Sequence, residues 1–372
     1  MKKLFALLIV TLVLGTMLFV GCRPPILEGA VVDIQQGQYE SAFAKLQQAV
    51  QEYPNNPEAW YLLGTLYARK ENFVKMNESF DKSLAIAQTY AKEIEQVRMT
   101  NFANNYNDAL NSYYKKAREV DDPVTRKKMY AKAAEKFLKA HQANPERSEP
   151  LAPMSVSFLE TGDTATAVKY MDKAIEMNPK KDTLMVTVGD FYTKINRMDK
   201  AVELYKKALT VNPDNTAAHL ALGQVYAQQK LWDKAIEQFD ISAKADPKNA
   251  TIPENIAIIY YNNEKYAEAV PYLKKSLELD PSNKDMYEVL SLCYLQMAQK
   301  HIDKYTDTEN MDEKAAADQI YKTALPFLED AVKKFPDSAL LWNNLGVCYA
   351  QEGMKEKAKA AFEKQKQLEG KQ

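Results

Sequence analysis

Apolar, small and helix-breaking residues recur along the chain with a period of 34 residues. Twelve residues before each of five evenly spaced prolines lies an Ala, and eight before lies a large apolar residue. The prolines are Pro145, Pro179, Pro213, Pro247 and Pro281. Because proline cannot donate a helical hydrogen bond, each ends one helix and starts the next turn. The period therefore predicts a chain of repeated helical pairs.

Small and large residues have complementary roles within each predicted pair. The small ones let the two helices approach closely, and they are Ala133, Ala167, Ala201, Ala235 and Ala269. The large ones fill the space between the helices, and they are Phe137, Met171, Tyr205, Phe239 and Leu273. A further small position is expected to admit a neighbouring backbone, and it is held by Gly64, Gly189, Gly223 and Gly346. One pair cannot bury its apolar face alone, so the pairs are expected to stack.

The same residues match both halves of a known repeat consensus. The first half, W-L-G-Y, occurs as Trp60, Leu63, Gly64 and Tyr67, and again as Trp342, Leu345, Gly346 and Tyr349. The second half, A-F-A-P, is the series of small, large and proline positions described above. The chain therefore resembles the tetratricopeptide repeat (TPR) family. The resemblance implies an all-α fold, a right-handed α-solenoid of stacked helix-turn-helix units.

Nine repeat frames fit the sequence after the leader described below. We predict a single solenoid over residues 26–372. The frames are 23–56, 57–90, 91–147, 148–181, 182–215, 216–249, 250–283, 284–338 and 339–372. Frames 91–147 and 284–338 are longer than the others. The second helix of the last frame is mostly polar, which suits a cap at the end of the stack.

The two long frames predict helices that extend beyond the regular repeats. In the first, apolar residues keep helical spacing until Asp121, Asp122 and Pro123 make a turn, so we expect a long hairpin tipped by residues 118–128. In the second, we expect a helix from 284 to about 304, a polar loop over 305–311 and a helix from near Asp312. Acidic residues of this segment weakly suggest Ca²⁺, but the Gly of an EF-hand loop is absent and a solvated loop is favoured. The extensions either make specific contacts or buttress neighbouring repeats.

The N-terminal segment has the pattern of a lipoprotein leader. Lys2 and Lys3 precede an apolar run over residues 4–20, as in a secretory signal peptide. The run ends in Val20, Gly21 and Cys22, which resembles the bacterial lipobox. We therefore expect a signal peptide at 1–21, lipidation of Cys22 and a short tether over 22–25. In enterobacterial lipoprotein sorting, Asp directly after the lipidated Cys retains the protein at the inner membrane. By resemblance, Arg23 at this position permits transport to the outer membrane. The alternative is an uncleaved signal anchor.

Composition and motifs argue against nucleic-acid binding and catalysis. The 49 basic and 50 acidic residues give no electrostatic footprint for nucleic acid, and 46% hydrophobic residues exclude a disordered chain. His141, His219 and His301 lie far apart in sequence, and no phosphate loop or H-E-x-x-H motif occurs. Two S-x-x-K matches, 79–82 and 112–115, lie inside predicted repeat helices with no K-T-G after them. We expect no enzyme, no metal and no cofactor.

Cys293, Cys348 and His219 are predicted to serve the core. Both Cys residues occupy the same position of their first helices, and equivalent positions of packed helices lie about 8–10 Å apart. A disulfide needs Cα atoms within about 7 Å, so we expect two unpaired buried thiols. His219 stands where the family has Trp, which favours a packed or half-exposed core residue over a metal ligand.

The resemblance also implies a binding surface, because TPR solenoids bind partners along the concave face formed by the first helices. The positions carried over are Tyr61, Thr65, Arg69, Val186, Asp190, Lys194, Leu220, Gln224, Gln228, Glu254, Ile258, Tyr261, Glu288, Leu292, Leu295, Asn343, Val347 and Gln351. The last repeats offer an apolar strip beside Glu254 and Glu288, which suits an apolar or mildly basic segment of a partner. Alternatively, some of these apolar residues only pack against the next helix.

Together these features predict a monomeric, lipid-anchored, non-enzymatic scaffold or assembly factor that faces the periplasm. The partner is expected to be a protein or peptide, and the membrane is reached through the lipid alone. The outer membrane is the expected location, with the inner membrane and the cell surface as alternatives. In design the chain is similar to TPR lipoproteins of outer-membrane β-barrel assembly and of type IV pilus biogenesis. The alternative is a lipoprotein that regulates a peptidoglycan synthase or hydrolase, or that binds glycan itself.

Overall fold

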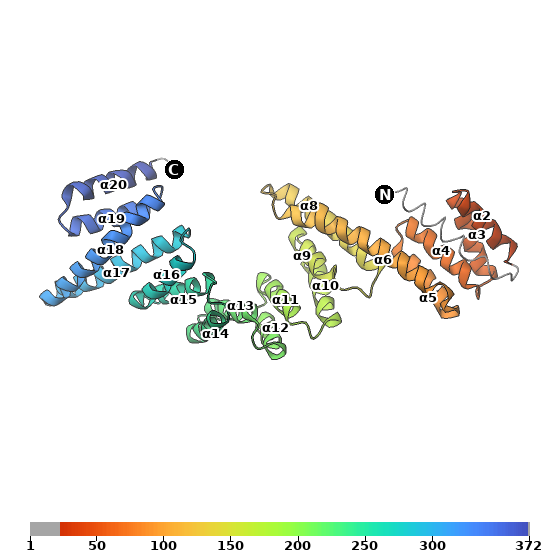
Figure 1. Ribbon diagram of the computed structural model, residues 1–372, viewed down its shortest axis with the longest axis horizontal. Coiled ribbons are helices and arrows are strands. Elements are labelled where there is room, and N and C mark those ends of the chain that lie inside the picture. Colours follow the sequence, from red (N-terminus) through yellow and green to blue (C-terminus); the bar gives the residue numbers. More distant parts are fainter. Residues whose placement is uncertain (1–22, 371–372) are drawn as a thin grey trace. The chain divides into compact units, whose positions relative to one another are not determined.

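The computed structural model describes residues 23–370, and its internal contacts divide the chain after Pro179 into unit 1 and, from Lys180, unit 2 (Figure 1). The predicted signal peptide and Cys22 lie outside the described residues. Within residues 23–370 the regular structure is entirely helical, as predicted. The single solenoid over both units stays a prediction.

Unit 1 consists of four helix pairs, the third of them extended. Its helices follow the predicted frames, and Pro25, which was assigned to the tether, is already the first residue of α2. The elements are α2 (Pro25–Gln35), α3 (Tyr39–Glu52), α4 (Pro57–Arg69), α5 (Phe73–Ile86), η1 (Gln88–Tyr90), α6 (Ala91–Asp108), η2 (Ala109–Tyr114), α7 (Lys115–Ala117), α8 (Pro123–Ala143), α9 (Leu151–Thr161) and α10 (Thr164–Met177).

Unit 2 consists of five helix pairs, of which the fourth is extended. Each second helix that precedes a repeat proline ends two residues before it, as the inability of proline to donate a hydrogen bond requires. The elements are α11 (Asp182–Lys194), α12 (Met198–Val211), α13 (Thr216–Gln228), α14 (Trp232–Ala245), α15 (Thr251–Asn262), α16 (Tyr266–Leu279), α17 (Lys284–Thr308), α18 (Met311–Lys334), α19 (Ala339–Gln351) and α20 (Lys355–Glu369).

The predicted small and large positions form the core of both units. Every Ala of the small series is completely buried, and the large residues from Phe137 to Leu273 are at most 1% exposed. The second half of the consensus was therefore interpreted correctly from spacing alone.

The regularly spaced glycines admit an aromatic ring, and the expected neighbouring backbone is found at Gly64, where the carbonyl oxygen of Met76 would lie 3.2 Å from an added Cβ. A Cβ built on Gly64 would lie 2.4 Å from Cε1 of Phe80, and one on Gly189 would lie 2.4 Å from Cε1 of Tyr205. Phe239 approaches Gly223 in the same way. The ring belongs to the second helix of the same pair, so these glycines set the distance between the two helices of one repeat.

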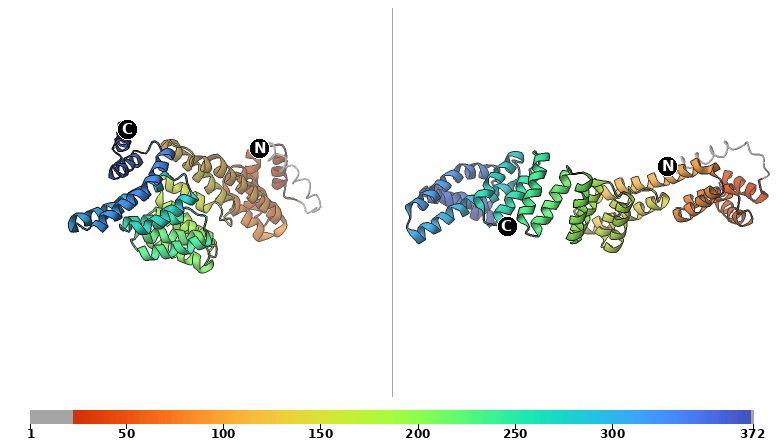
Figure 2. Two further views of the ribbon diagram at one scale, coloured as in Figure 1. Left: turned by 60° about the vertical axis from the view of Figure 1, so that its left-hand side comes forward. Right: turned by 90° about the horizontal axis from the view of Figure 1, so that it is seen from below.

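Both long frames form helical hairpins that are longer than the regular pairs (Figures 1 and 2). In unit 1, α6 continues through the π-helical segment η2 and α7, and the chain turns before α8, as expected. In unit 2, the predicted polar loop over 305–311 was wrong, because α17 continues to Thr308 and α18 begins at Met311. Asn310 caps α18 by accepting a hydrogen bond from the backbone N–H of Asp312, and Glu309 makes the turn with φ 55°.

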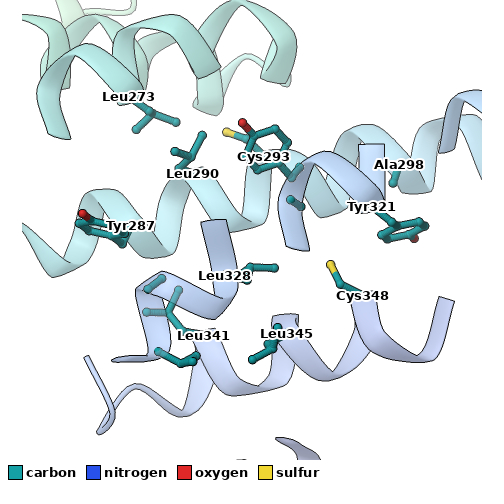
Figure 3. Packing of buried hydrophobic residues seen from close by; sticks show 14 of the residues in the cluster. Leu273, Tyr287, Leu290, Cys293, Ala298, Tyr321, Leu328, Leu341, Leu345 and Cys348 are labelled. Carbon is teal, nitrogen blue, oxygen red and sulfur yellow. The ribbon is translucent and has the colours of Figure 1, made fainter. Parts of the chain in front are cut away.

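The two thiols are buried and unpaired, as predicted. Cys293 of α17 and Cys348 of α19 are both completely buried in the apolar core of unit 2, with Leu290, Leu328 and Leu345 among the neighbouring residues (Figure 3). Burial raises the pKa of each thiol to about 12. At neutral pH both groups are therefore protonated and poorly nucleophilic.

Candidate protein-binding surface

The candidate groove residues of unit 1 are engaged in contacts within the unit. Tyr61 is 6% exposed and stacks on Tyr90 of η1 with ring centroids 4.6 Å apart. The hydroxyl of Thr65 donates to a carbonyl of its own helix, and the guanidinium of Arg69 lies 3.7 Å from the ring centroid of Tyr39. Tyr90, directly before the extended repeat, thus covers Tyr61, which cannot line an open groove.

The two glutamates among the candidates of unit 2 are hydrogen-bonded to the caps of the following first helices. Asn283 caps α17, and its Nδ2 donates to Oε2 of Glu254 at 3.3 Å. Ser338 caps α19, and its hydroxyl donates to Oε1 of Glu288 at 2.6 Å. Both carboxylates are half-buried, so they link successive repeats in addition to any contact with a partner.

The apolar strip of unit 2 is present and partly used by the core. All five of its side chains are half-buried, and they come from α15, α17 and α19. Four of them also pack against the buried cluster of the unit, in agreement with the alternative that packing uses part of their surface. The strip consists of Ile258, Tyr261, Leu292, Leu295 and Val347.

The remaining candidates of unit 2 differ in exposure. Val186 is 8% exposed and belongs to the core. Asp190 accepts a hydrogen bond from the hydroxyl of Tyr205 at 2.8 Å, and Asn343 donates to Oδ1 of Asn344 at 3.3 Å. Leu220 is half-buried, and the exposed members are Asp190, Lys194, Gln224, Gln228 and Gln351.

The electrostatic environment of the strip is negative near Glu254. Burial raises the pKa of this carboxyl group, and the charges of Asp285 and Asp280 raise it further. These carboxylates repel one another, so a cation brought close to them would relieve that repulsion. The environment favours a segment with a basic residue beside apolar ones.

His219 takes the place of a tryptophan as a hydrogen-bond donor. Trp60 and Trp342 each donate their indole N–H to the carbonyl of the proline six residues earlier, at 2.8 and 3.1 Å. Nε2 of His219 lies 2.9 Å from the carbonyl oxygen of Pro213, the same contact. A carbonyl can only accept, so Nε2 carries the proton. His219 is 8% exposed, and the prediction of a packed residue is confirmed.

The other titratable groups do not gather into a site. Nε2 of His141 accepts from Nζ of Lys173 at 2.8 Å, and burial together with that charge lowers the pKa of His141. His301 pairs with Glu313 across the second hairpin. Over residues 23–370, no group of three or more His, Cys, Asp or Glu side chains is arranged to hold a metal ion.

A shallow cavity of about 230 Å³ lies in unit 1 and was not foreseen from the sequence. It is formed where α3, α4 and α5 meet, with Trp60 and Tyr67 on its lining beside Lys75 and Lys82. Nζ of Lys82 lies 4.2 Å from the ring of Trp60. Trp60 and Tyr67 belong to the W-L-G-Y consensus, which assigns them to repeat packing, so no sequence signal indicated a cavity here.

Stacked pairs of antiparallel helices, with a small and a large residue at the same place in each pair, define an α-helical repeat protein. Models of the TPR repeat match residues 32–70 and 189–230, and models of the tetratricopeptide repeat match 255–283, 154–181 and 339–372. The chain belongs to the tetratricopeptide repeat family. Both long hairpins lie outside the matched segments. TPR domains serve as scaffolds for protein–protein interaction, and this chain is a scaffold of that class.

Solved structures similar to this chain are TPR proteins of low sequence identity. YrrB, described as a TPR protein with an unusual peptide-binding site, is 22% identical over 53% of this chain and 91% of its own, with a TM-score of 0.42. A structure of MamA is 23% identical over 49% of this chain and 95% of its own, with a TM-score of 0.38. Among curated proteins, none matches the chain.

Proposed function

We propose that the chain is a lipid-anchored, non-enzymatic scaffold or assembly factor that faces the periplasm from the outer membrane. The observation that carries this proposal is the sequence Val20-Gly21-Cys22, which ends an apolar leader directly before the first repeat. A lipidated Cys with two or more acyl chains would give stable membrane attachment. Within residues 23–370, no helix has the length and apolar character needed to cross a bilayer.

The contacts of Arg23 support attachment close to the membrane. Its Nε and Nη2 donate to the two carboxylate oxygens of Glu58 at 3.1 and 2.7 Å, and Nη1 donates to Glu28 at 2.9 Å. These hydrogen bonds, first of all those to Glu58, raise the pKa of Arg23. Consecutive Cα atoms lie about 3.8 Å apart, so residue 22 is one residue away from this bidentate pair. A lipid on Cys22 would hold unit 1 at the membrane with almost no free tether.

Replacing Cys22 by alanine is expected to leave an uncleaved precursor, because the lipoprotein signal peptidase acts on the lipidated Cys. Blocking that peptidase in cells with the native sequence should give the same larger product on a gel. Cys348→Ala is the matched control, since it removes a buried thiol and should leave processing unchanged. A product of unchanged size in the presence of the peptidase inhibitor would contradict the lipoprotein assignment.

The partner is proposed to bind along the strip of unit 2 through an apolar segment that carries a basic residue. The half-buried apolar side chains supply contact area, and Glu254 and Glu288 supply the negative charge. Charge reversal at these two positions would also disturb the helix caps that bind them. Glu→Gln substitutions avoid this, because the amide oxygen can still accept from Asn283 and Ser338.

A photo-crosslinking residue at Leu292 is expected to capture the partner in cells, and the product should decrease about fivefold when Glu254→Gln and Glu288→Gln are added. Ile241 is the matched control site, because it is an exposed apolar residue on α14, the second helix of its pair. Equal amounts of crosslinked partner from Leu292 and Ile241, or no effect of the two Glu→Gln substitutions, would exclude the strip as the binding surface. Capture of peptidoglycan strands in place of a protein would favour the glycan-binding alternative.

A further inference from the structure

The tips of the two long hairpins carry opposite charge. We call residues 115–128 the basic tip and residues 303–313 the acidic tip. The basic tip contains six Lys or Arg residues against three acids, and the acidic tip contains five acids against Lys304. The basic tip belongs to unit 1 and the acidic tip to unit 2.

Most of these charges have no ion-pair partner among the described residues. Lys116, Arg118, Lys127 and Lys128 of the basic tip are exposed, and none forms an ion pair within residues 23–370. At the acidic tip, Asp307, Glu309 and Asp312 are likewise exposed and unpaired there. Elsewhere in both units, many surface Lys and Arg residues do pair with a nearby carboxylate, for example Lys139 with Glu71 at 2.8 Å.

An exposed apolar side chain lies at the same place on each tip. Val124 is the second residue of α8 and is 61% exposed, and Met311 is the first residue of α18 and is 62% exposed. They are the two most exposed large apolar side chains of the described chain. The second helix begins with a side-chain cap at each tip, Asp122 for α8 and Asn310 for α18. An apolar residue among charges that are mostly of one sign is typical of a small protein contact surface.

The tips do not buttress the repeats of their own units. All residues from 118 to 128 are exposed or half-buried, and so are all residues from 303 to 313. Ala117 is the one buried residue of the basic tip, and the other buried residues of the hairpins lie outside the tips, for example Tyr130 in unit 1 and Ala298 and Ala317 in unit 2. The family models also leave both hairpins out, so repeat packing does not explain the charges.

We propose that the basic tip of one copy binds the acidic tip of a second copy, with Val124 and Met311 at the centre of the contact. Opposite potentials would steer the encounter, and the two apolar side chains would be removed from water together. The contact is heterologous, so a bound pair keeps one free tip of each kind, and further copies can add to it in a row. The contact involves only the two hairpin tips, so we expect the isolated chain to be monomeric when dilute and to associate at high local concentration.

Cysteine crosslinking between two differently tagged copies of the full-length chain tests this contact. One copy carries Val124→Cys and the other carries Met311→Cys, and a short bis-maleimide is added to cells that produce both. The buried Cys293 and Cys348 should not react, and the parental chains measure any background from Cys22. Val74→Cys replaces Val124→Cys as the matched control, since Val74 is 51% exposed and lies in the same unit on α5. The tip pair should give at least about threefold more mixed dimer than this control.

Charge reversal separates a specific contact from random collision. Lys127→Glu with Lys128→Glu in the first copy should reduce the mixed dimer to the control level, because like charges then face each other. Adding Asp307→Lys with Glu309→Lys to the second copy should restore it, which a variant that merely misfolds would not do. The proposal is overturned if the tip pair gives no more mixed dimer than the Val74 control. It is also overturned if neither charge reversal changes the amount of mixed dimer.

Discussion

Phe239→Ala will lower the free energy of unfolding of unit 2 by about 3–5 kcal/mol, the range typical of removing a buried phenylalanine. Phe239 is completely buried, and its ring occupies the space above Gly223, where a Cβ would lie 2.6 Å from Cε1. Gly223 has no side chain that could move into the vacated space, so the cavity persists. The repeat is the second of the five in unit 2 and has a neighbour on each side, so the loss also weakens contact with both neighbouring repeats.

Denaturant unfolding measures the total loss, and hydrogen exchange of α13 and α14 should show that protection falls first in this repeat. Phe362→Ala is the matched control, since Phe362 occupies the same repeat position above Gly346. Phe362 is half-buried and lies in the last repeat, so its removal should cost about half as much. Equal losses at the two sites would contradict the view that burial between two neighbouring repeats determines the effect.

The period of the sequence was sufficient to predict the fold, because each repeat position has one physical role. Ala201 and Tyr205 are buried in unit 2 for the same reason as Ala133 and Phe137 in unit 1. The loop was predicted too long, over 305–311 instead of 309–310, because polar residues such as Thr306 and Thr308 are typical of loops. Their hydroxyls donate to helix carbonyls at 2.9 and 2.6 Å, so both residues fit the helix.

The candidate surface was less predictable than the fold, because its accessibility depends on contacts between residues far apart in sequence. Tyr61 lies at a groove position but is covered by Tyr90, 29 residues later in the chain. Glu288 reads as a free acid, yet Ser338 of the following repeat donates to it. The family pattern gives the position of a residue on its helix. Side chains that come later in the chain determine whether that residue is accessible to a partner.

The size of the residue at the glycine position is matched to the size of the residue that faces it, as a comparison of the repeats of this chain shows. Four repeats combine Gly at this position with an aromatic residue on the second helix, as in Gly64 with Phe80. Four others combine Ala or Ser with Leu or Met at the equivalent positions: Ala30 with Leu46, Ser155 with Met171, Ala257 with Leu273 and Ser291 with Leu328. A larger residue on one helix accompanies a smaller one on the other, so the two positions together set the helix spacing.

Gly64→Ala will therefore destabilise unit 1 by about 1–2 kcal/mol, even though Ala favours a helix by about 1 kcal/mol over Gly. The new Cβ would lie 2.4 Å from Cε1 of Phe80, and this ring cannot withdraw because it is completely buried and stacked near Tyr61. Gly29→Ala is the control in the same unit: its Cβ would meet Lys45 at 3.5 Å, an ordinary contact, so stability should rise by up to about 1 kcal/mol.

The double variant Gly64→Ala with Phe80→Leu decides between steric overlap and any other cause. It recreates the combination of Ala30 with Leu46 in the preceding repeat. The double variant should therefore lose less free energy of unfolding than the two single variants lose together, by about 1 kcal/mol or more. Chemical denaturation of all four proteins under one condition gives this coupling energy. Additive losses would mean that the ring and the glycine do not constrain each other, and that the size pairing across the repeats has another origin.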